Sequence, residues 1–247
     1  MHTYPIISDH AAVEIVEQLL NLREKWSSIR PGFSVLGTPL WLKGVPAGQI
    51  QATNCILQEH FGNLLEKINI GLAKVLGEPI KSMEGFSLPG FHIFESLNGE
   101  DPIRPPVELH YDSELWGEIF GQDPKLSKKY NKKEFFNPEL TLSFTLSLKL
   151  PKTGTGLYTW PTLNRDELIS YANTLEVSRF ATMACLLSQH KREYIPYKIG
   201  HFITHNGQVV HWIPPMAISS ETIPVGEQRI TLQGHGIKHA GVWEIFW

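Results

Sequence analysis

The sequence predicts a mainly β protein with helices, an α+β fold in which N-terminal helices pack on a double-sheet β domain. Apolar residues follow helical spacing in residues 1–82, whereas residues 83–247 contain short strands separated by turns. With 247 residues and 42% hydrophobic content, the chain fits a single domain, residues 1–247, with one large core. The helical part therefore comes first, and the β core supplies the remainder.

Two helices are expected in the N-terminal part. Ser8 or Asp9 can cap the first, and Gly77 and Pro79 end the second. Residues 33–42, which lie between the two helices, are expected to be extended. The apolar positions that define the helices are Val13, Val16, Leu19, Leu20 and Trp26 in the first, and Leu57, Phe61, Leu64, Leu65, Ile68, Leu72 and Val75 in the second.

Residues 140–150 alternate without a fault between apolar and polar side chains, which predicts a strand with one buried face. The N-terminal helices are expected to cover that face. The opposite face carries Thr141, Ser143 and Thr145, and we expect it to be solvated. Asn164 and Glu167 resemble a capping box that opens a helical insertion over about residues 164–190. Further strands are expected at residues 91–94, 107–110 and 156–160, and from 197 to the end.

Composition excludes several classes of function. The net charge of −3 gives no basic stripe, so nucleic acid is not an expected partner. The two cysteines are too few for a disulfide framework, and no apolar run approaches the length of a membrane span. A cytoplasmic enzyme that acts on a small-molecule substrate is the expectation, and the sequence does not indicate an oligomeric state.

The segment His110-Tyr111-Asp112 places an imidazole and a carboxylate one residue apart. On a strand, such side chains point to the same side and can bind one ion together. A distant histidine, His211, is also preceded by a short strand-like run. Two imidazoles and one carboxylate occupy one face of an octahedral Fe(II) and leave the other positions open. His110, Asp112 and His211 are thus the candidate catalytic metal ligands.

His201 and His205 are the rivals of His211 for the distal position. The spacing His201-x-x-x-His205 lacks the glutamate of a zinc-protease motif, and its surroundings indicate a strand. His205 precedes Asn206-Gly207, a strong turn signal, so we expect it at a loop tip. His92, His190, His235 and His239 fit no motif.

Arg229 and Thr231 form a candidate site for a carboxylate. The guanidinium offers a bidentate fork, and the hydroxyl two residues later offers a second donor. Strand alternation puts Arg229, Thr231 and Gln233 on one face. The intervening positions are apolar or small, so an unpaired charge among them would be costly.

The ordered set His110-x-Asp112, His211 and Arg229-x-Thr231 resembles the Fe(II) and 2-oxoglutarate dependent oxygenases, over roughly residues 83–236. The resemblance implies a double-stranded β-helix, or jelly-roll, core. It also implies Fe(II), 2-oxoglutarate as co-substrate, and O2. In that family the oxo acid chelates iron through its 1-carboxylate and 2-keto oxygen, and its far carboxylate pairs with the arginine.

The expected reaction is oxidation of a small organic substrate such as an amino acid or a secondary metabolite, and hydroxylation is preferred over desaturation or ring formation. Asp112 argues against halogenation, because halogenases of that family have glycine or alanine at this position. The alternatives are a cupin-like metalloenzyme that uses no oxo acid, a non-catalytic jelly-roll binding module, and an enzyme that acts on a protein or peptide.

Overall fold

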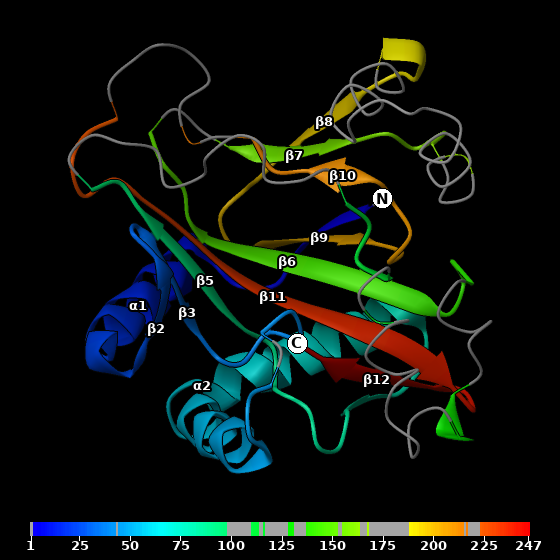
Figure 1. The fold of residues 1–247 in the computed structure, drawn as a ribbon, viewed down its shortest axis with the longest axis horizontal. Coiled ribbons are helices and arrows are strands. Elements are labelled where there is room, and N and C mark those ends of the chain that lie inside the picture. The colour runs from blue at the N-terminus through cyan, green and yellow to red at the C-terminus, as the bar shows by residue number, and fades with distance from the viewer. Residues whose placement is uncertain are drawn as a thin grey trace.

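The computed structural model contains a large, mostly antiparallel sheet, a small three-stranded sheet, and two helices that pack on the large sheet (Figure 1). The described residues are 2–42, 44–97, 110–113, 116, 128–130, 137–152, 155–163, 167, 188–214, 216 and 223–247. Among them, no helix is both long and apolar enough to cross a membrane.

The two expected helices are present as α1 (Asp9–Leu20) and α2 (Ala47–Leu76). Ser8 caps α1, since its hydroxyl accepts a hydrogen bond from the Ala11 amide at 3.2 Å. Gly77 ends α2 in the left-handed conformation, with φ of 71°, which glycine adopts at little cost. The first helix is shorter than predicted: Trp26 lies beyond a 3-10 turn (Arg23–Lys25), and Val13 is 54% exposed.

The large sheet has the order β1-β9-β6-β11-β5-β3-β2, in which neighbouring strands are antiparallel. In addition, β12 pairs with the second half of β11 and runs parallel to β4. The bounds are β1 His2–Pro5, β2 Ser27–Arg30, β3 Phe33–Leu36, β4 Ile80–Ser82, β5 Gly90–Glu95, β6 Thr141–Lys149, β9 His201–His205, β11 Gln228–His239 and β12 Val242–Phe246.

The small sheet has the antiparallel order β10-β7-β8, and Figure 1 shows it above the large sheet. Its strands are β7 (Gly156–Thr159), β8 (Glu193–Pro196) and β10 (His211–Trp212). The expected strand at 107–110 lies outside the described residues except for His110, which forms an isolated bridge with His211. The expected helical insertion at 164–190 also falls almost wholly outside them.

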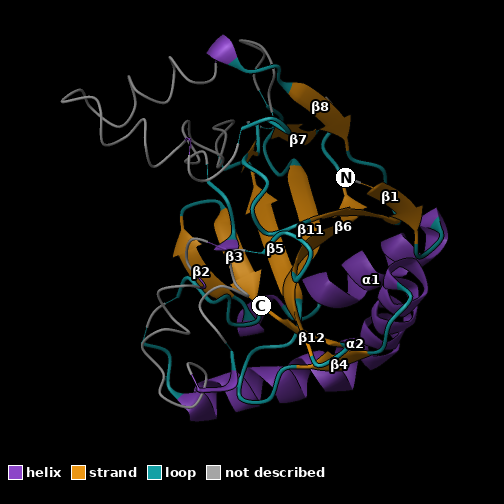
Figure 2. Cartoon of the chain, turned by 90° about the vertical axis from the view of Figure 1, so that its right-hand side faces the viewer, coloured by secondary structure: helices purple, strands orange, loops and turns teal. Residues whose placement is uncertain are grey.

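The helices cover one face of the large sheet, as the alternation of β6 predicted (Figure 2). Leu142, Phe144 and Leu146 share one hydrophobic cluster with residues of α1 and α2. Alternate residues of β11 and β5, such as Ile230 and Ile93, belong to the same cluster. The large sheet therefore turns its other face toward the small sheet.

The expectation that the hydroxyl face of β6 is solvated is wrong. Thr141, Ser143 and Ser147 are no more than 3% exposed. Period-two alternation defines which residues share a face, but it does not say what covers that face. The hydroxyl face of β6 is the face of the large sheet that points away from the helices, and it is buried although its side chains are polar.

Glu244 of β12 joins β12 to two other segments. Its carboxylate is 3% exposed and lies 2.9 Å from Lys81 Nζ and 2.6 Å from Lys129 Nζ, and it accepts a hydrogen bond from the Tyr130 hydroxyl. Burial alone would raise the pKa of Glu244, but the contacts with Lys129, Tyr130 and Lys81 lower it from its ordinary 4.5 to about 2.

We predict that these contacts make stability depend on pH. Because the folded pKa of Glu244 lies below the unfolded value, its contribution is complete above about pH 4.5 and is lost as the pH falls toward 2. Glu244→Gln should therefore be less stable than the wild type at pH 7, and the difference should shrink on acidification. Urea unfolding at several pH values measures this gap, and a gap that does not change with pH would contradict the role given to the carboxylate.

Candidate metal centre

The centre of the candidate site is a backbone bridge between two residues far apart in sequence. The His110 amide donates to the His211 carbonyl at 3.3 Å, and the His211 amide donates to the His110 carbonyl at 3.0 Å. The two imidazole rings consequently lie 4.4 Å apart, centroid to centroid. This bridge brings together the two histidines that the sequence motifs nominated.

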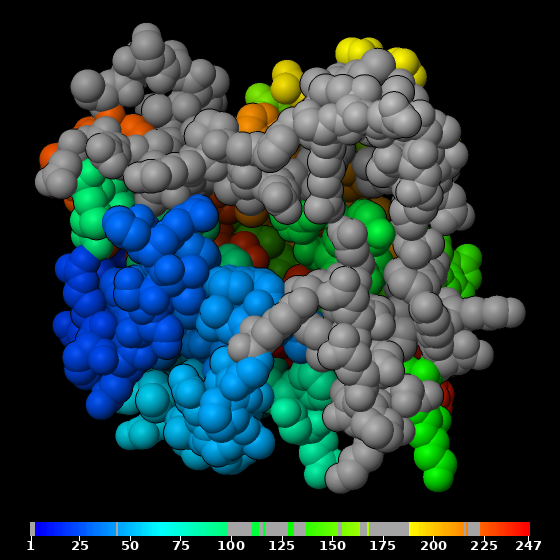
Figure 3. All heavy atoms as spheres, viewed as in Figure 1, coloured from blue at the N-terminus to red at the C-terminus, as the bar shows by residue number. Residues whose placement is uncertain are grey.

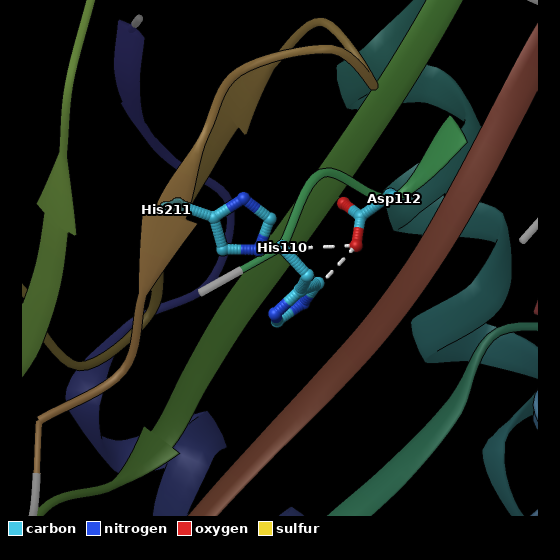
Figure 4. A group of neighbouring side chains, drawn as sticks. All are labelled: His110, Asp112 and His211. Carbon is cyan, nitrogen blue, oxygen red and sulfur yellow. Dashed lines mark ion pairs between the residues drawn. The ribbon is translucent and has the colours of Figure 1, made fainter. Parts of the chain in front are cut away.

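Asp112 completes the group. Its Oδ1 lies 3.6 Å from His110 Nε2 and 3.8 Å from His211 Nε2, and one ligand atom from each of the three residues lies within 4.8 Å of the others. Figure 4 shows the three side chains pointing toward one another. Ser113, the next residue, is fixed to the loop after β9, since its amide donates to the Gly207 carbonyl at 2.8 Å.

The protonation states suit a cation. Burial lowers the pKa of His211 to about 3, although Asp112 acts in the opposite direction, so the imidazole is neutral at pH 7. Burial acts to raise the pKa of Asp112, but the surrounding imidazoles outweigh it and keep that pKa well below its usual range. A neutral imidazole and an ionised carboxylate are the forms that bind metals.

A hydrogen bond orients the distal imidazole. His211 Nδ1 lies 2.8 Å from the Val209 carbonyl oxygen, which accepts a hydrogen bond when Nδ1 carries the proton. Nε2 then presents its lone pair toward Asp112 and His110. Such a contact to the far ring nitrogen is the usual support of a metal-binding histidine.

His205 is close to the group but is not part of it. It is the last residue of β9 and is 9% exposed, so the expected position at a loop tip is wrong. Its ring lies 4.8 Å from that of His211, and its Nδ1 contacts the Asn206 carbonyl at 2.9 Å. The turn that Asn206-Gly207 predicts is present, but it begins after His205, which is therefore the buried last residue of β9.

His235 is a neighbour of the site that the sequence analysis missed. Its Nδ1 lies 3.9 Å from Asp112 Oδ2 and 3.2 Å from the Ser143 hydroxyl. It follows Arg229, Thr231 and Gln233 at intervals of two on β11, so the alternation that grouped those residues could have found it.

Arg229 and Thr231 lie on β11, and both are fully buried. The guanidinium carbon of Arg229 lies 5.3 Å from the ring centroid of Phe94 and 5.1 Å from that of Tyr197. Both residues point away from the helices, because their neighbours Ile230 and Leu232 belong to the core beneath the sheet. They therefore share the face that carries His235, the neighbour of Asp112.

Figure 3 shows that the molecule is hollowed near the centre of the face viewed there, with red atoms of β11 visible at the base of the hollow. The order of strands explains this position, since β11 lies between β5 and β6 in the middle of the large sheet. A ligand that entered here would meet side chains of these strands.

No protein-family model and no curated protein matches the chain. Among solved structures, SnoN, a non-heme alpha ketoglutarate dependent epimerase from nogalamycin biosynthesis, is 14% identical with a TM-score of 0.48, over 97% of this chain and 81% of SnoN. SnoN has also been solved in complex with Fe3+, alpha ketoglutarate and nogalamycin RO.

Two further structures are similar. An N-substituted L-amino acid dioxygenase from Burkholderia ambifaria AMMD is 16% identical, with a TM-score of 0.44 over 96% of this chain and 91% of that protein. AviO1 from Streptomyces viridochromogenes Tue57 is 12% identical, with a TM-score of 0.49 over 96% and 88%. Residue roles do not transfer at these identities, so the site is interpreted from its own side chains.

We predict that His110→Ala and His211→Ala each abolish stoichiometric Fe(II) binding, whereas His205→Ala leaves most of it. Each of the first two variants removes one of three ligands from the group, and His205 lies outside that group. Metal content after anaerobic loading and desalting gives the comparison, with circular dichroism as the test of folding. Loss of iron in His205→Ala with retention in His211→Ala would make His205 the third ligand.

Proposed function

We propose that the protein is an Fe(II) and 2-oxoglutarate dependent dioxygenase with a jelly-roll core. His110, Asp112 and His211 would hold the metal, and Arg229 with Thr231 would bind the far carboxylate of the oxo acid. The observation that carries the proposal is the triad itself, in which two imidazoles and one carboxylate converge within 4.8 Å.

The donor set fits Fe(II) better than a structural zinc site. Structural zinc is normally enclosed by four protein ligands, often thiolates, whereas the described part of the chain supplies three ligands to this group and no cysteine. A set of two histidines and one carboxylate with open positions is the arrangement typical of non-haem Fe(II) oxygenases. When bound, Fe(II) with 2-oxoglutarate and O2 supplies an oxidant strong enough to break a C–H bond.

The side chains of the protein would bind the oxo acid and orient it. Arg229 is buried against two aromatic rings, so it cannot follow a ligand into solvent, and a carboxylate that it binds would be held at a fixed place. Binding the oxo acid at both ends would fix its orientation relative to the triad.

The reaction we propose is hydroxylation of a small organic substrate, such as an amino acid or a secondary metabolite. Asp112 supplies a carboxylate where halogenases of the family that the sequence resembles have glycine or alanine. That difference favours oxygen insertion over halogenation. Desaturation or ring formation would use the same residues, and product analysis by mass spectrometry distinguishes these outcomes.

We predict that 2-oxoglutarate stabilises the folded protein only when metal is present, because the two would share one site. A ligand that binds only the native state adds about 2.7 kcal/mol at one hundred times its dissociation constant. Thermal unfolding without oxygen should give the highest melting temperature with Mn(II) plus 2-oxoglutarate, a lower one with Mn(II) plus succinate, and the lowest with Mn(II) alone. A metal-loaded protein indifferent to 2-oxoglutarate would favour a metalloenzyme that uses no oxo acid.

Arg229→Lys should weaken 2-oxoglutarate binding while leaving Mn(II) binding unchanged. Lysine keeps the charge but loses the planar fork, and disturbing a buried charged contact costs about 2 to 5 kcal/mol, hence roughly thirty-fold to several thousand-fold in affinity. Calorimetric titration of the metal-loaded protein measures this. Arg30→Lys, on the mostly exposed strand β2, is the matched control and should bind as the wild type.

A further inference from the structure

Three polar residues on three neighbouring strands are paired with one another across the centre of the large sheet. In the strand register, Thr231 of β11 is paired with Ser147 of β6 on one side and with His92 of β5 on the other. Paired residues of adjacent antiparallel strands project to the same face, with Cβ atoms roughly 5 Å apart. We name Ser147, Thr231 and His92 the polar row.

The polar row faces away from the helices. The residues next to its members along each strand, Leu146, Leu232 and Ile93 among them, belong to the core beneath the sheet. Alternation therefore sends the row to the opposite side, the same side as Arg229 and the metal centre.

Two members of the row have buried polar atoms for which the described part of the chain supplies no hydrogen-bond partner. Among the described residues, no group hydrogen-bonds Nε2 of His92 or Oγ of Ser147, although the two residues are 9% and 0% exposed. Burying such groups without a partner is costly, and native proteins do so rarely. Thr231 accepts a hydrogen bond from Gln233 Nε2 at 3.3 Å, so its own hydroxyl hydrogen is left to donate elsewhere.

Aromatic side chains hold His92 in place. Its ring lies 5.3 Å from that of Phe33, 6.1 Å from Trp41 and 5.1 Å from Trp247. Trp247 in turn packs directly on Gly37 and Gly90, where a side-chain carbon would approach its ring within 2.4 Å. His92 also lies 6.2 Å from Phe94, the ring that contacts Arg229.

The charge state of His92 is fixed by its surroundings. Burial, helped by Arg229 and His235 and opposed by Asp112, lowers its pKa to about 3. At neutral pH the ring is uncharged and carries one N–H donor. A neutral donor and two hydroxyls beside a buried guanidinium form a set that matches a carboxylate, which accepts several hydrogen bonds.

We propose that His92 and Ser147 complete, together with Arg229 and Thr231, a binding site for a single carboxylate group, the far carboxylate of a dicarboxylic oxo acid. This inference rests on the proposed function and deepens it. It makes the polar row the part of the site that selects 2-oxoglutarate over oxo acids that end in a methyl group.

The test compares two ligands on the Mn(II)-loaded protein without oxygen. 2-Oxoglutarate and pyruvate share the keto acid end, but only 2-oxoglutarate has a second carboxylate. His92→Phe keeps an aromatic ring and removes the donor, while Ser147→Ala removes one oxygen. Each should weaken 2-oxoglutarate binding by roughly ten-fold or more, as expected for a hydrogen bond to a charged group, and leave pyruvate binding unchanged. Calorimetry measures both affinities.

Trp41→Phe is the matched control, because it alters the aromatic surroundings of His92 and leaves every donor of the polar row and Arg229 in place. It should bind both ligands as the wild type does. His92→Gln restores an N–H donor without the ring, and it should recover part of the preference for 2-oxoglutarate over pyruvate. Melting temperature and Mn(II) affinity are measured first, to confirm that each variant is folded and loaded.

Three results would overturn the inference. The first is unchanged 2-oxoglutarate affinity in both His92→Phe and Ser147→Ala. The second is an equal loss of pyruvate and 2-oxoglutarate affinity, which would mean that these residues act at the metal end. The third is a wild-type protein that binds Mn(II) but no 2-oxoglutarate, and only this result removes the proposed function as well.

Discussion

The structure of the site depends on the pair of backbone hydrogen bonds that joins His110 to His211. Both bonds join backbone atoms, so the fold itself brings the two imidazoles together. Asp112 then lies within reach because it follows His110 by two residues and because Ser113 is held to Gly207. A preformed group of this kind avoids the cost of ordering ligands when the metal binds.

The large sheet has an apolar face, which packs on the helices and stabilises the fold, and a polar face, which carries the residues of the candidate site. The leucines of β6 pack against α1 and α2, while the hydroxyls of the same strand line the space beside the metal centre. Because the side chains alternate, each strand that contributes to the core also presents residues to the site. The helices therefore support the sheet that carries Arg229 and Thr231 without approaching either of them.

At two carboxylates, Glu244 and Asp112, neighbouring side chains outweigh the effect of burial and lower the pKa. Glu244 is stabilised by lysines and a tyrosine and serves to join segments of the fold. Asp112 lies among imidazoles, and burial lowers the pKa of one of them, His211, so that its ring is uncharged at neutral pH. Lysine ammonium groups balance the charge of Glu244. The uncharged ring of His211 does not balance the charge of Asp112, so that site favours a cation.

The sequence by itself determined the two helices, the strands at residues 91–94, 140–150 and 156–160, the His110-x-Asp112 pair and the strand position of Arg229 and Thr231. These features are local, since they follow from the spacing of side chains along one segment. The sequence favoured His211 over His205 as the distal histidine, and the tertiary structure shows His211 beside His110 and Asp112, because its backbone pairs with that of His110. The tertiary structure alone decided that the hydroxyl face of β6 is buried, and it brought His92, Ser147 and His235 to the site. Those residues belong to no motif, because pairing between strands far apart in the chain brings them together. The spacing of residues within one strand does not show which other strand it pairs with.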